Sequence, residues 1–307
     1  VVLSGSGSGG EPSVVGTLPK ETVQVQQGSS TFNTTVHAKG ALVAENSANQ
    51  VMFSKSRSTA FYPSSTTKVM TALLAIEKGN LKDMVSVSPS VRNVPFDSSK
   101  AHVAPGDRMT LEQLIYGMML PSGNDAAVAV AVHVGGSEAQ FVKMMNDRAK
   151  ELGATKTRFT NPHGYHHANM VTTPEDMAKI AFAAAEHPEL MKIMGAGSYT
   201  TKYKNASGAT VSRTWNSTNQ MVRPGTSFYN PRIIGGKTGY TSLSLHNLIS
   251  IAKQNNNTYV MVVLRGDRTQ RYNDTNRMLN GAVQASQSSS NSGKAMTIQL
   301  HDYVIEV

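Results

Sequence analysis

The chain has 307 residues, 39% of them hydrophobic and 16% charged, a balance typical of a globular protein long enough to bury its own core. It contains no cysteine, which excludes disulfides, thiol nucleophiles and zinc–thiolate sites. The formal net charge of +9 suits general solubility or an anionic cell-wall polymer or membrane surface, but the Lys and Arg residues are too scattered to indicate nucleic acid binding. No apolar run is long enough to span a bilayer, and no signal peptide is visible.

Composition divides the chain into three parts. Residues 1–30 begin with a Gly/Ser-rich run and are predicted to be a flexible N-terminal segment. Residues 31–285 hold nearly all of the regular hydrophobic patterns and are expected to form the main domain. Residues 286–307 are predicted to be a Ser/Asn-rich linker that ends in a short strand, which would at most begin a second domain.

The main domain is predicted to start with a hairpin and a helix. Residues 41–45 and 51–53 are β-rich and flank a polar turn, which indicates a β-hairpin at a sheet edge. From Ser65 to Lys78 apolar residues recur at helical spacing, so a helix begins at or just after Ser65. Gly79 stands where a left-handed C-cap is expected.

The middle of the chain is predicted to be an all-helical subdomain over about residues 80–205. Two of its helices begin with the capping-box pattern, Ser or Thr followed three residues later by Gln. Another begins with Thr followed by proline at the first helical position. The predicted helices cover residues 110–120, 126–134, 138–152 and a segment that starts at Thr173.

The last part of the main domain returns to strands and closes with a helix. The predicted strands cover residues 209–215, 247–252 and 258–264, and the helix covers residues 269–285. We therefore predict a mixed α/β fold. In it the N- and C-terminal segments form a mostly antiparallel sheet flanked by helices, and the helical subdomain is inserted between them.

The first of three chemically informative motifs is Ser-x-x-Lys at residues 65–68. Residues three apart on a helix share a face, so the amine of Lys68 can reach the hydroxyl of Ser65. A serine hydroxyl needs such a base to become a nucleophile, and a lysine can act as one only if its pKa is depressed. Burial and a second cation, Lys237, would depress it.

The second motif is Ser122-Gly123-Asn124, which follows a predicted helix end, and the third is Lys237-Thr238-Gly239. The third follows a β-rich run and is predicted to be an edge strand that an extended peptide can join through backbone hydrogen bonds. Its cation and hydroxyl suit a terminal carboxylate. Each motif alone is weak, and their order and spacing carry the interpretation.

In this order the three motifs resemble the serine β-lactamase and penicillin-binding protein superfamily. Longer stretches resemble its low-molecular-mass members, the serine D-alanyl-D-alanine carboxypeptidases, over about residues 35–285. These stretches are residues 62–71, 120–126, 161–164 and 236–241. The resemblance implies a β-lactamase/transpeptidase-like fold with the active site between the sheet and the inserted subdomain.

The resemblance also implies a reaction and its catalytic residues. A peptidoglycan stem peptide that ends in D-Ala-D-Ala would acylate Ser65 and lose its terminal D-alanine, without metal or cofactor, and β-lactam antibiotics would acylate the same serine. Lys68 would be the base, Ser122 a proton shuttle, and Asn124 would position the substrate and Lys68. The enzyme would work outside the cytoplasm, secreted or associated with the cell envelope.

The remaining site residues belong to the predicted edge strand. In the resemblance, Lys237 and Thr238 hold the carboxylate of the substrate, and Gly239 belongs to the strand that binds the peptide. The backbone N–H groups at the helix start of Ser65 would form one half of an oxyanion hole. The amide of Tyr240 would supply the other half.

Three alternatives to a serine carboxypeptidase remain open. A β-lactamase would need a fast deacylating group such as the class A glutamate, but Glu175 and Asp176 look like first-turn helix charges. A β-lactam sensor would be acylated without turnover. The His163, His166 and His167 cluster admits a zinc carboxypeptidase, although without a companion carboxylate these imidazoles are expected to be solvated groups on a loop.

Two departures from the carboxypeptidase pattern stand out. This family usually has a small Ala-Gly pair where Ser244-Leu245 stands. Its better-known members also carry a C-terminal β-domain and an amphipathic anchor, and residues 286–307 are too few for such a domain. The oligomeric state has no signature in the sequence.

Overall fold

The computed structural model describes the backbone of residues 31–304 and the side chains of residues 31–291. The flexible segment predicted for residues 1–30 lies outside this range. The body contains a five-stranded antiparallel sheet with strand order β2-β1-β9-β8-β7, so β2 and β7 are its edges. These strands are β1 (Gly40–Glu45), β2 (Val51–Lys55), β7 (Ile233–Thr241), β8 (Leu245–Gln254) and β9 (Asn257–Gly266).

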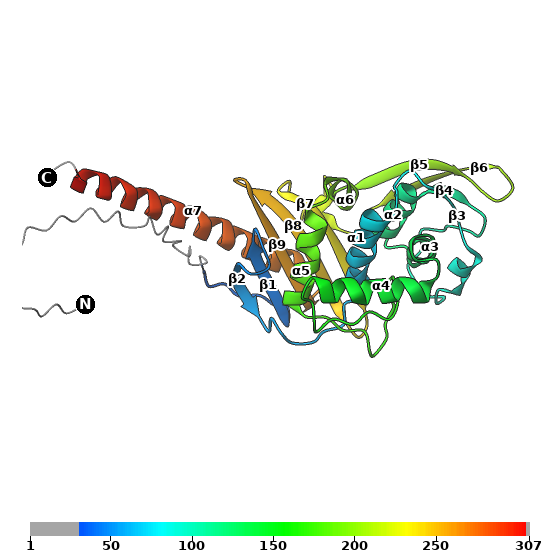
Figure 1. Cartoon of the computed structure of the whole chain (residues 1–307), viewed down its shortest axis with the longest axis horizontal. Helices are drawn as coiled ribbons and strands as arrows, with labels where there is room; N and C mark the ends of the chain where they lie inside the picture. The colour runs from blue at the N-terminus through cyan, green and yellow to red at the C-terminus, as the bar shows by residue number, and fades with distance from the viewer. Residues whose placement is uncertain (1–30, 305–307) are drawn as a thin grey trace, which may run out of the picture.

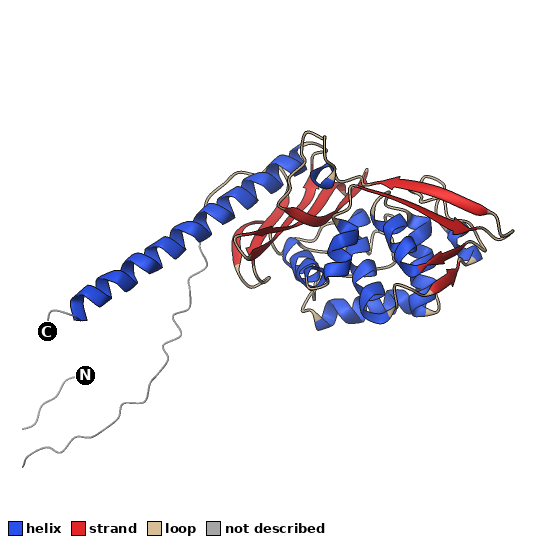
Figure 2. Cartoon of the chain, turned by 90° about the horizontal axis from the view of Figure 1, so that it is seen from above, coloured by secondary structure: helices blue, strands red, loops and turns tan. Residues whose placement is uncertain are grey.

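The five-stranded sheet buries both of its faces. Leu42 on β1 and Val262 on β9 belong to the core that the internal helices share, whereas their neighbours Val43 and Val263 face α7. This alternation follows from the two-residue period of a strand. Figure 2 shows α7 on one side of the sheet and the other helices on the opposite side. The predicted hairpin, the later strands and the antiparallel α/β fold are confirmed.

The helices lie close to their predicted positions. The helices of the body are α1 (Lys68–Lys78), α2 (Leu111–Met119), α3 (Asn124–Gly135), α4 (Glu138–Glu151), α5 (Pro174–Ala185) and α6 (Pro188–Met194), and three short 3₁₀ segments are η1 (Ser64–Thr67), η2 (Pro89–Asn93) and η3 (Gln220–Val222). The Thr110 capping box is present in full, with both of its hydrogen bonds to Gln113. The pattern of cap residues therefore located helix starts correctly.

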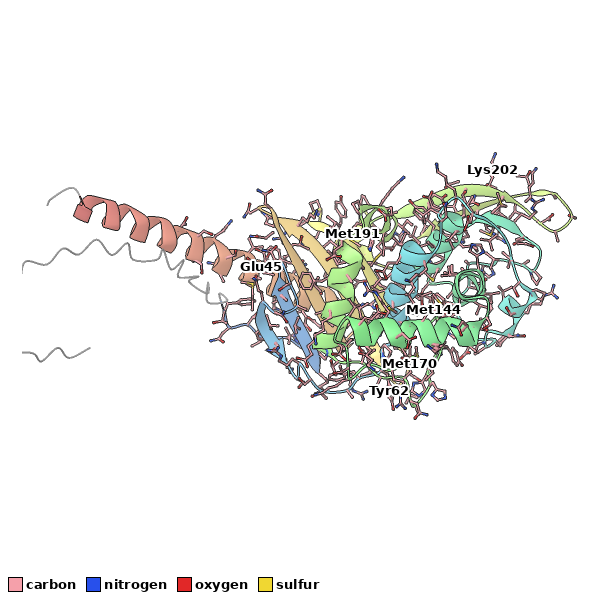
Figure 3. All side chains as sticks on the ribbon, viewed as in Figure 1. Glu45, Tyr62, Met144, Met170, Met191 and Lys202 are labelled. Atoms are coloured by element: carbon pink, nitrogen blue, oxygen red, sulfur yellow. The ribbon has the colours of Figure 1, made fainter. Side chains whose placement is uncertain are left out.

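The inserted subdomain is not all-helical, which corrects the prediction. Its second sheet has the order β3-β4-β5-β6 and consists of β3 (Met84–Ser86), β4 (Arg108–Thr110), β5 (Ser198–Lys204) and β6 (Thr210–Asn216). The long β5–β6 ribbon reaches the end of the molecule opposite α7, and Lys202 lies on it (Figures 1 and 3). Only one residue of each ribbon strand is fully buried, Tyr203 and Trp215, so the hydrophobic signal for β5 was weak.

Gly79 ends α1 in a different way from that expected. Its φ of −101° and ψ of 179° are extended, not left-handed. A Cβ at this position would lie 2.6 Å from Leu111 Cδ2 and 2.8 Å from the carbonyl oxygen of Ala75. Glycine is therefore needed here for close packing against α2, because no side chain fits.

The C-terminal segment is also different from the prediction. Helix α7 runs from Gln270 to Val304, so the expected linker and strand are replaced by helix as far as the structure extends. The Ser288 hydroxyl donates to the Gln284 carbonyl at 3.1 Å, and the Ser290 hydroxyl to the Ser286 carbonyl at 3.1 Å. These bonds give the two hydroxyls a partner within the helix itself. The C-terminal end of α7 projects away from the body (Figure 1).

Asp274 fastens α7 to the chain entering β1. Its fully buried carboxylate accepts hydrogen bonds from the backbone N–H groups of His37 at 2.9 and 3.1 Å and of Ala38 at 3.0 Å. Arg277 on the next turn of α7 donates to the same carboxylate at 3.2 Å. A charged acceptor here satisfies two backbone donors that water reaches poorly.

Asp274→Ala should lower the free energy of unfolding by about 3 kcal/mol, because buried donors lose a charged partner. Urea unfolding followed by circular dichroism measures this. Asp147→Ala, which removes an exposed carboxylate paired with Lys143 on α4, is the matched control and should change stability by less than about 0.5 kcal/mol. Equal losses in the two variants would show that Asp274 is not a fastening point.

Candidate active site

Ser65 lies in η1, directly before α1, and it lines a cavity that residues of all three motifs surround. The preceding residue, Ser64, has a φ of +47°. Two glycines pack against this segment, and a Cβ on Gly164 or Gly239 would lie 1.9 Å from Ser64 O or 2.3 Å from Ser64 Oγ. The backbone at Gly164 and at Gly239 thus confines the conformation of Ser64 from two sides.

The amine of Lys68 is buried beneath Ser65. Its Nζ lies 3.0 Å from Ser65 Oγ and donates to Asn124 Oδ1 at 2.7 Å and to the carbonyl of His163 at 2.8 Å. The side chain is completely inaccessible to solvent. One turn of helix therefore brings Ser65 and Lys68 together, as their spacing predicted.

Burial holds the pKa of Lys68 well below its ordinary value. The nearby cation of Lys237 lowers it further, while Asp125 acts in the opposite direction. Burial and the Arg271 guanidinium lower the pKa of Lys237 itself to about 7. A depressed pKa lets an amine take a proton near neutrality.

The second motif forms the tight connection between α2 and α3. Ser122 has a φ of +61°, and its carbonyl accepts the hydroxyl of Ser99 at 2.6 Å. Among the side chains that the structure describes, Ser122 Oγ is one of the few buried polar atoms without a hydrogen-bond partner, and Ser122 lines the cavity. Asn124 is the first residue of α3, so its side-chain amide contacts Lys68 from the inserted subdomain.

Strand β7 forms the opposite wall of the cavity. Thr238, Gly239 and Tyr240 line it, and Lys237 is buried with its Nζ donating to the Thr238 carbonyl at 2.8 Å. Because β7 is a sheet edge, its outer backbone groups have no neighbouring strand within residues 31–304. A Cβ on Gly239 would lie 3.0 Å from the Ser65 backbone nitrogen, so the strand passes close to the start of η1.

The cavity has a volume of about 490 Å³, and it brings together residues that the motifs did not indicate. These additional lining residues are Ser99, Pro121, Thr218, His246, Arg268 and Arg271. Arg271 is nearly buried, and the described part of the chain offers neither Arg271 nor Lys237 an ion-pair partner. The only sequence signal for Arg271 was its place early in the last predicted helix.

Of the three histidines expected to be solvated, His163 is buried, whereas His166 is partly exposed and His167 is exposed as predicted. His163 is buried, and burial together with the Lys68 cation lowers its pKa to about 3, so the ring is neutral. Its Nδ1 accepts the Tyr165 N–H at 3.1 Å, whereas the His166 ring packs edge-on against Tyr62. Within residues 31–291, no three acidic or histidine side chains form a group that could hold a metal.

His163 acts on the site through its backbone, because its carbonyl oxygen receives Lys68 Nζ. The same loop and the start of η1 line a small depression together with Tyr62 and Met170, at one edge of the molecule (Figure 3). Sequence reasoning missed this role, since a carbonyl oxygen carries no residue signature.

Neither the acidic pair Glu175-Asp176 nor the departure from the family pattern at Ser244-Leu245 lines the cavity. Glu175 accepts hydrogen bonds from Arg57 at 3.1 Å and Ser58 at 2.9 Å, and it does not line the cavity. Ser244 is buried in the β7–β8 turn, where its hydroxyl accepts the Thr241 N–H at 2.9 Å. Leu245 follows with a φ of +56°.

Comparison with known proteins gives one consistent family. The Peptidase_S11 family, described as D-alanyl-D-alanine carboxypeptidase, matches residues 24–268. D-alanyl-D-alanine carboxypeptidase DacF of Bacillus subtilis (strain 168) is 34% identical over 243 residues, which cover 78% of this chain and 60% of that protein. D-alanyl-D-alanine carboxypeptidase of Streptomyces sp. (strain K15) is 32% identical over 241 residues, 75% of this chain and 81% of that protein. The match thus spans less than two thirds of the Bacillus protein.

Solved structures share the fold. The crystal structure of the Streptomyces K15 DD-transpeptidase has a TM-score of 0.76 at 29% identity, over 82% of this chain and 99% of that one. The D-alanyl-D-alanine carboxypeptidase from Mycobacterium tuberculosis H37Rv has a TM-score of 0.71 at 26% identity, over 83% of this chain and 94% of that one. The predicted β-lactamase/transpeptidase-like architecture is therefore confirmed.

Replacing Lys237 with methionine should raise the pKa of Lys68, because a neighbouring like charge disappears. If neutral Lys68 activates Ser65, the midpoint at which acylation speeds up with pH should move to higher pH. The measurement is the pH profile of acylation by an uncharged activated ester, which does not depend on carboxylate recognition. Lys143→Met on exposed α4 is the control and should leave the midpoint in place, whereas a fixed or lower midpoint in Lys237→Met contradicts the coupling.

Proposed function

This chain belongs to the D-alanyl-D-alanine carboxypeptidase family Peptidase_S11, and on that basis we propose that it removes the terminal D-alanine from peptidoglycan stem peptides through an acyl-enzyme at Ser65. The membership confirms the resemblance that the motifs indicated. One observation carries the proposal: the buried amine of Lys68 lies 3.0 Å from Ser65 Oγ, next to a cleft lined by Arg268 and Arg271, for which the described residues offer no ion-pair partner.

In the acylation step, neutral Lys68 removes the proton of Ser65, whose oxygen attacks the carbonyl of the penultimate D-alanine. The oxygen of the tetrahedral intermediate becomes negative and needs hydrogen-bond donors. The backbone N–H of Ser65 and that of Tyr240 on β7 are the proposed donors. The packing of Gly239 against the start of η1 supports this pairing, because it brings β7 next to the Ser65 nitrogen.

When the peptide bond breaks, the leaving D-alanine needs a proton on its nitrogen. Ser122 is suited to relay that proton, because its hydroxyl is buried, lines the cleft and has no other partner among the described residues. Asn124 holds the Lys68 amine by a hydrogen bond of 2.7 Å, and the proton that Lys68 took from Ser65 is the one that Ser122 passes to the leaving nitrogen. Water then attacks the ester, the shortened peptide leaves, and Ser65 regains its proton.

The carboxylate of the terminal D-alanine is proposed to bind between β7 and the start of α7. Lys237 and Thr238 come from the strand, and Arg271 supplies a guanidinium from the helix. A carboxylate there would pair with two cations that have no ion-pair partner among the described residues. β-Lactam antibiotics carry a carboxylate next to a strained amide, so they should occupy the same positions and acylate Ser65.

The substrate also suggests where the enzyme works. Peptidoglycan lies outside the cytoplasmic membrane, so we infer an extracytoplasmic, secreted or envelope-associated enzyme with roles in cell-wall biogenesis and cell shape. No helix in the described part of the chain is long and apolar enough to cross a membrane. The positive charge of the chain would favour contact with an anionic cell-wall polymer or membrane surface.

Transpeptidation is the second candidate activity, because one of the solved structures that share the fold is a DD-transpeptidase. The acyl-enzyme is common to both reactions, and only the acceptor differs, an amine in place of water. A β-lactamase would have to hydrolyse the penicilloyl-enzyme rapidly, and Glu175 does not line the cleft as a water-activating carboxylate would. A β-lactam sensor would be acylated once without releasing D-alanine.

Ser65→Ala should abolish both D-alanine release from diacetyl-Lys-D-Ala-D-Ala and covalent labelling by penicillin, because no nucleophile remains in the cleft. Free D-alanine is measured by a coupled D-amino acid oxidase assay, and labelling by a fluorescent penicillin. Circular dichroism checks that the variant is folded. Labelling that persists in folded Ser65→Ala would show that Ser65 is not the nucleophile. Labelling of wild type without D-alanine release would favour a sensor.

Arg271→Ala should raise the KM for diacetyl-Lys-D-Ala-D-Ala by about 10- to 100-fold, the value of a charge-assisted hydrogen bond. The same peptide with a C-terminal amide lacks the anionic partner, so its weaker turnover should change little. Arg271→Lys keeps a cation and should restore part of the loss. An equal loss for the acid and the amide would place carboxylate binding elsewhere.

A further inference from the structure

Asn247 lies outside the three motifs, on β8, directly opposite Gly239 of β7 in the sheet register. Its side chain is completely buried. A buried asparagine must satisfy two donor hydrogens and an acceptor oxygen within the protein. Its partners therefore show what the residue holds in place.

The Asn247 side chain binds the segment that precedes the nucleophile. Its Nδ2 donates to the carbonyl of Tyr62 at 3.0 Å, to the carbonyl of Pro63 at 3.1 Å and to Ser64 Oγ at 2.9 Å. Its Oδ1 accepts the backbone N–H of Arg265 at 2.9 Å. One side chain thus connects β8 to three consecutive residues that lie more than 180 positions earlier in the chain.

These hydrogen bonds act where the backbone is strained. A serine with a φ of +47° is in the left-handed region, which costs free energy and persists only when the surroundings fix it. Gly164 and Gly239 confine Ser64 from two sides without directional bonds. Asn247 hydrogen-bonds directionally to all three residues that precede Ser65, whereas Thr66 adds bonds to the Pro63 carbonyl alone.

Asn247 is linked to the other parts of the cleft as well. Its backbone pairs with Gly239, the residue before the proposed oxyanion donor Tyr240. Its carbonyl lies 3.4 Å from Arg271 Nη1, at the proposed carboxylate site. The nucleophile, the edge strand and the guanidinium are therefore all positioned relative to a single residue of β8.

We propose that Asn247 is a positioning residue for acylation, which holds Ser65 Oγ and the Ser65 N–H in line with β7. The inference rests on the proposed function, because it assumes attack by Ser65. Asn247 touches neither substrate nor reacting atoms and acts through the 62–64 backbone. Displacement of a nucleophile by about 1 Å can cost about 100-fold in rate, so its loss should affect the chemical step rather than binding.

The test is stopped-flow acylation by benzylpenicillin, which separates the noncovalent dissociation constant from the acylation rate constant. Asn247→Leu is nearly isosteric and uncharged, so it removes the hydrogen bonds without altering the charges around Lys68. We expect an acylation rate constant about 100-fold lower, a dissociation constant changed by less than about threefold and an unshifted pH midpoint.

The matched control is Asn146→Leu on α4, in the inserted subdomain. Asn146 Nδ2 donates to the carbonyls of Val142 and Phe159 at 3.2 and 2.9 Å, and its Oδ1 accepts the Phe159 N–H at 2.8 Å. This variant loses a comparable set of hydrogen bonds, so it should lose stability while acylating at the rate of wild type. A normal rate in folded Asn247→Leu, or an equal drop in rate in both variants, overturns the proposal.

Should Asn247→Leu fail to fold, Asn247→Ser carries the test, because it is smaller and leaves room for a water. It should acylate about tenfold more slowly than wild type, and an unchanged rate would again overturn the proposal. Wild type provides the separate check on the proposed function. If penicillin does not acylate Ser65 in wild type, the proposed function fails, whereas a failure confined to the Asn247 variants concerns positioning alone.

Discussion

The position of the Lys68 amine is the constraint on which the rest of the site depends. Removing an ammonium from water is costly unless it finds partners, and a fully buried one needs several. Lys68 obtains them from three separate parts of the chain: Ser65 beside it, Asn124 at the start of α3 and the carbonyl of His163. The hydrogen bonds of this one amine therefore hold η1, the start of α3 and the 161–164 loop together at one point.

Arg271, Lys237 and Lys68 form a series of neighbouring basic groups in which each one lowers the pKa of the next. Arg271 lowers the pKa of Lys237, and Lys237 lowers that of Lys68. A substrate carboxylate at the Arg271 end would offset part of this charge, and its departure with D-alanine would restore it. The arrangement therefore favours neutral Lys68 most strongly when the carboxylate site is empty, which is the stage at which the acyl-enzyme needs a base to activate water.

Much of this site could be predicted from the sequence because local periodicity sets its centre. Ser65 and Lys68 are one helical turn apart, and Lys237, Thr238 and Gly239 follow a clear strand pattern. The sequence could not indicate Asn247 or the carbonyl of His163, since their contacts join residues 95 to 185 positions apart. Such contacts depend on which segments the fold brings together, not on any local pattern.

The errors in the fold have a similar origin. Strand β5 shows little hydrophobic alternation, because only Tyr203 is buried along it. Its extended structure is instead stabilised by pairing with β6, which its own sequence does not indicate. The serine-rich part of α7 lacks strong helix formers, yet its hydroxyls donate to carbonyls one turn earlier. In β5 a pairing that forms only on folding decides the structure, and in α7 the segment is helical although its serines are weak helix formers, so propensity alone gives the wrong answer in both places.

Under the proposed mechanism, one cleft would serve two acceptors. The proposed base, edge strand and oxyanion donors would all act on the carbonyl carbon, and none of them would distinguish the molecule that arrives after D-alanine leaves. Water and an amine would each lose a proton to Lys68 and attack the same ester. The partition between hydrolysis and transpeptidation would then depend on access to the space vacated next to Ser122 and Arg271, and not on the residues that form the acyl-enzyme.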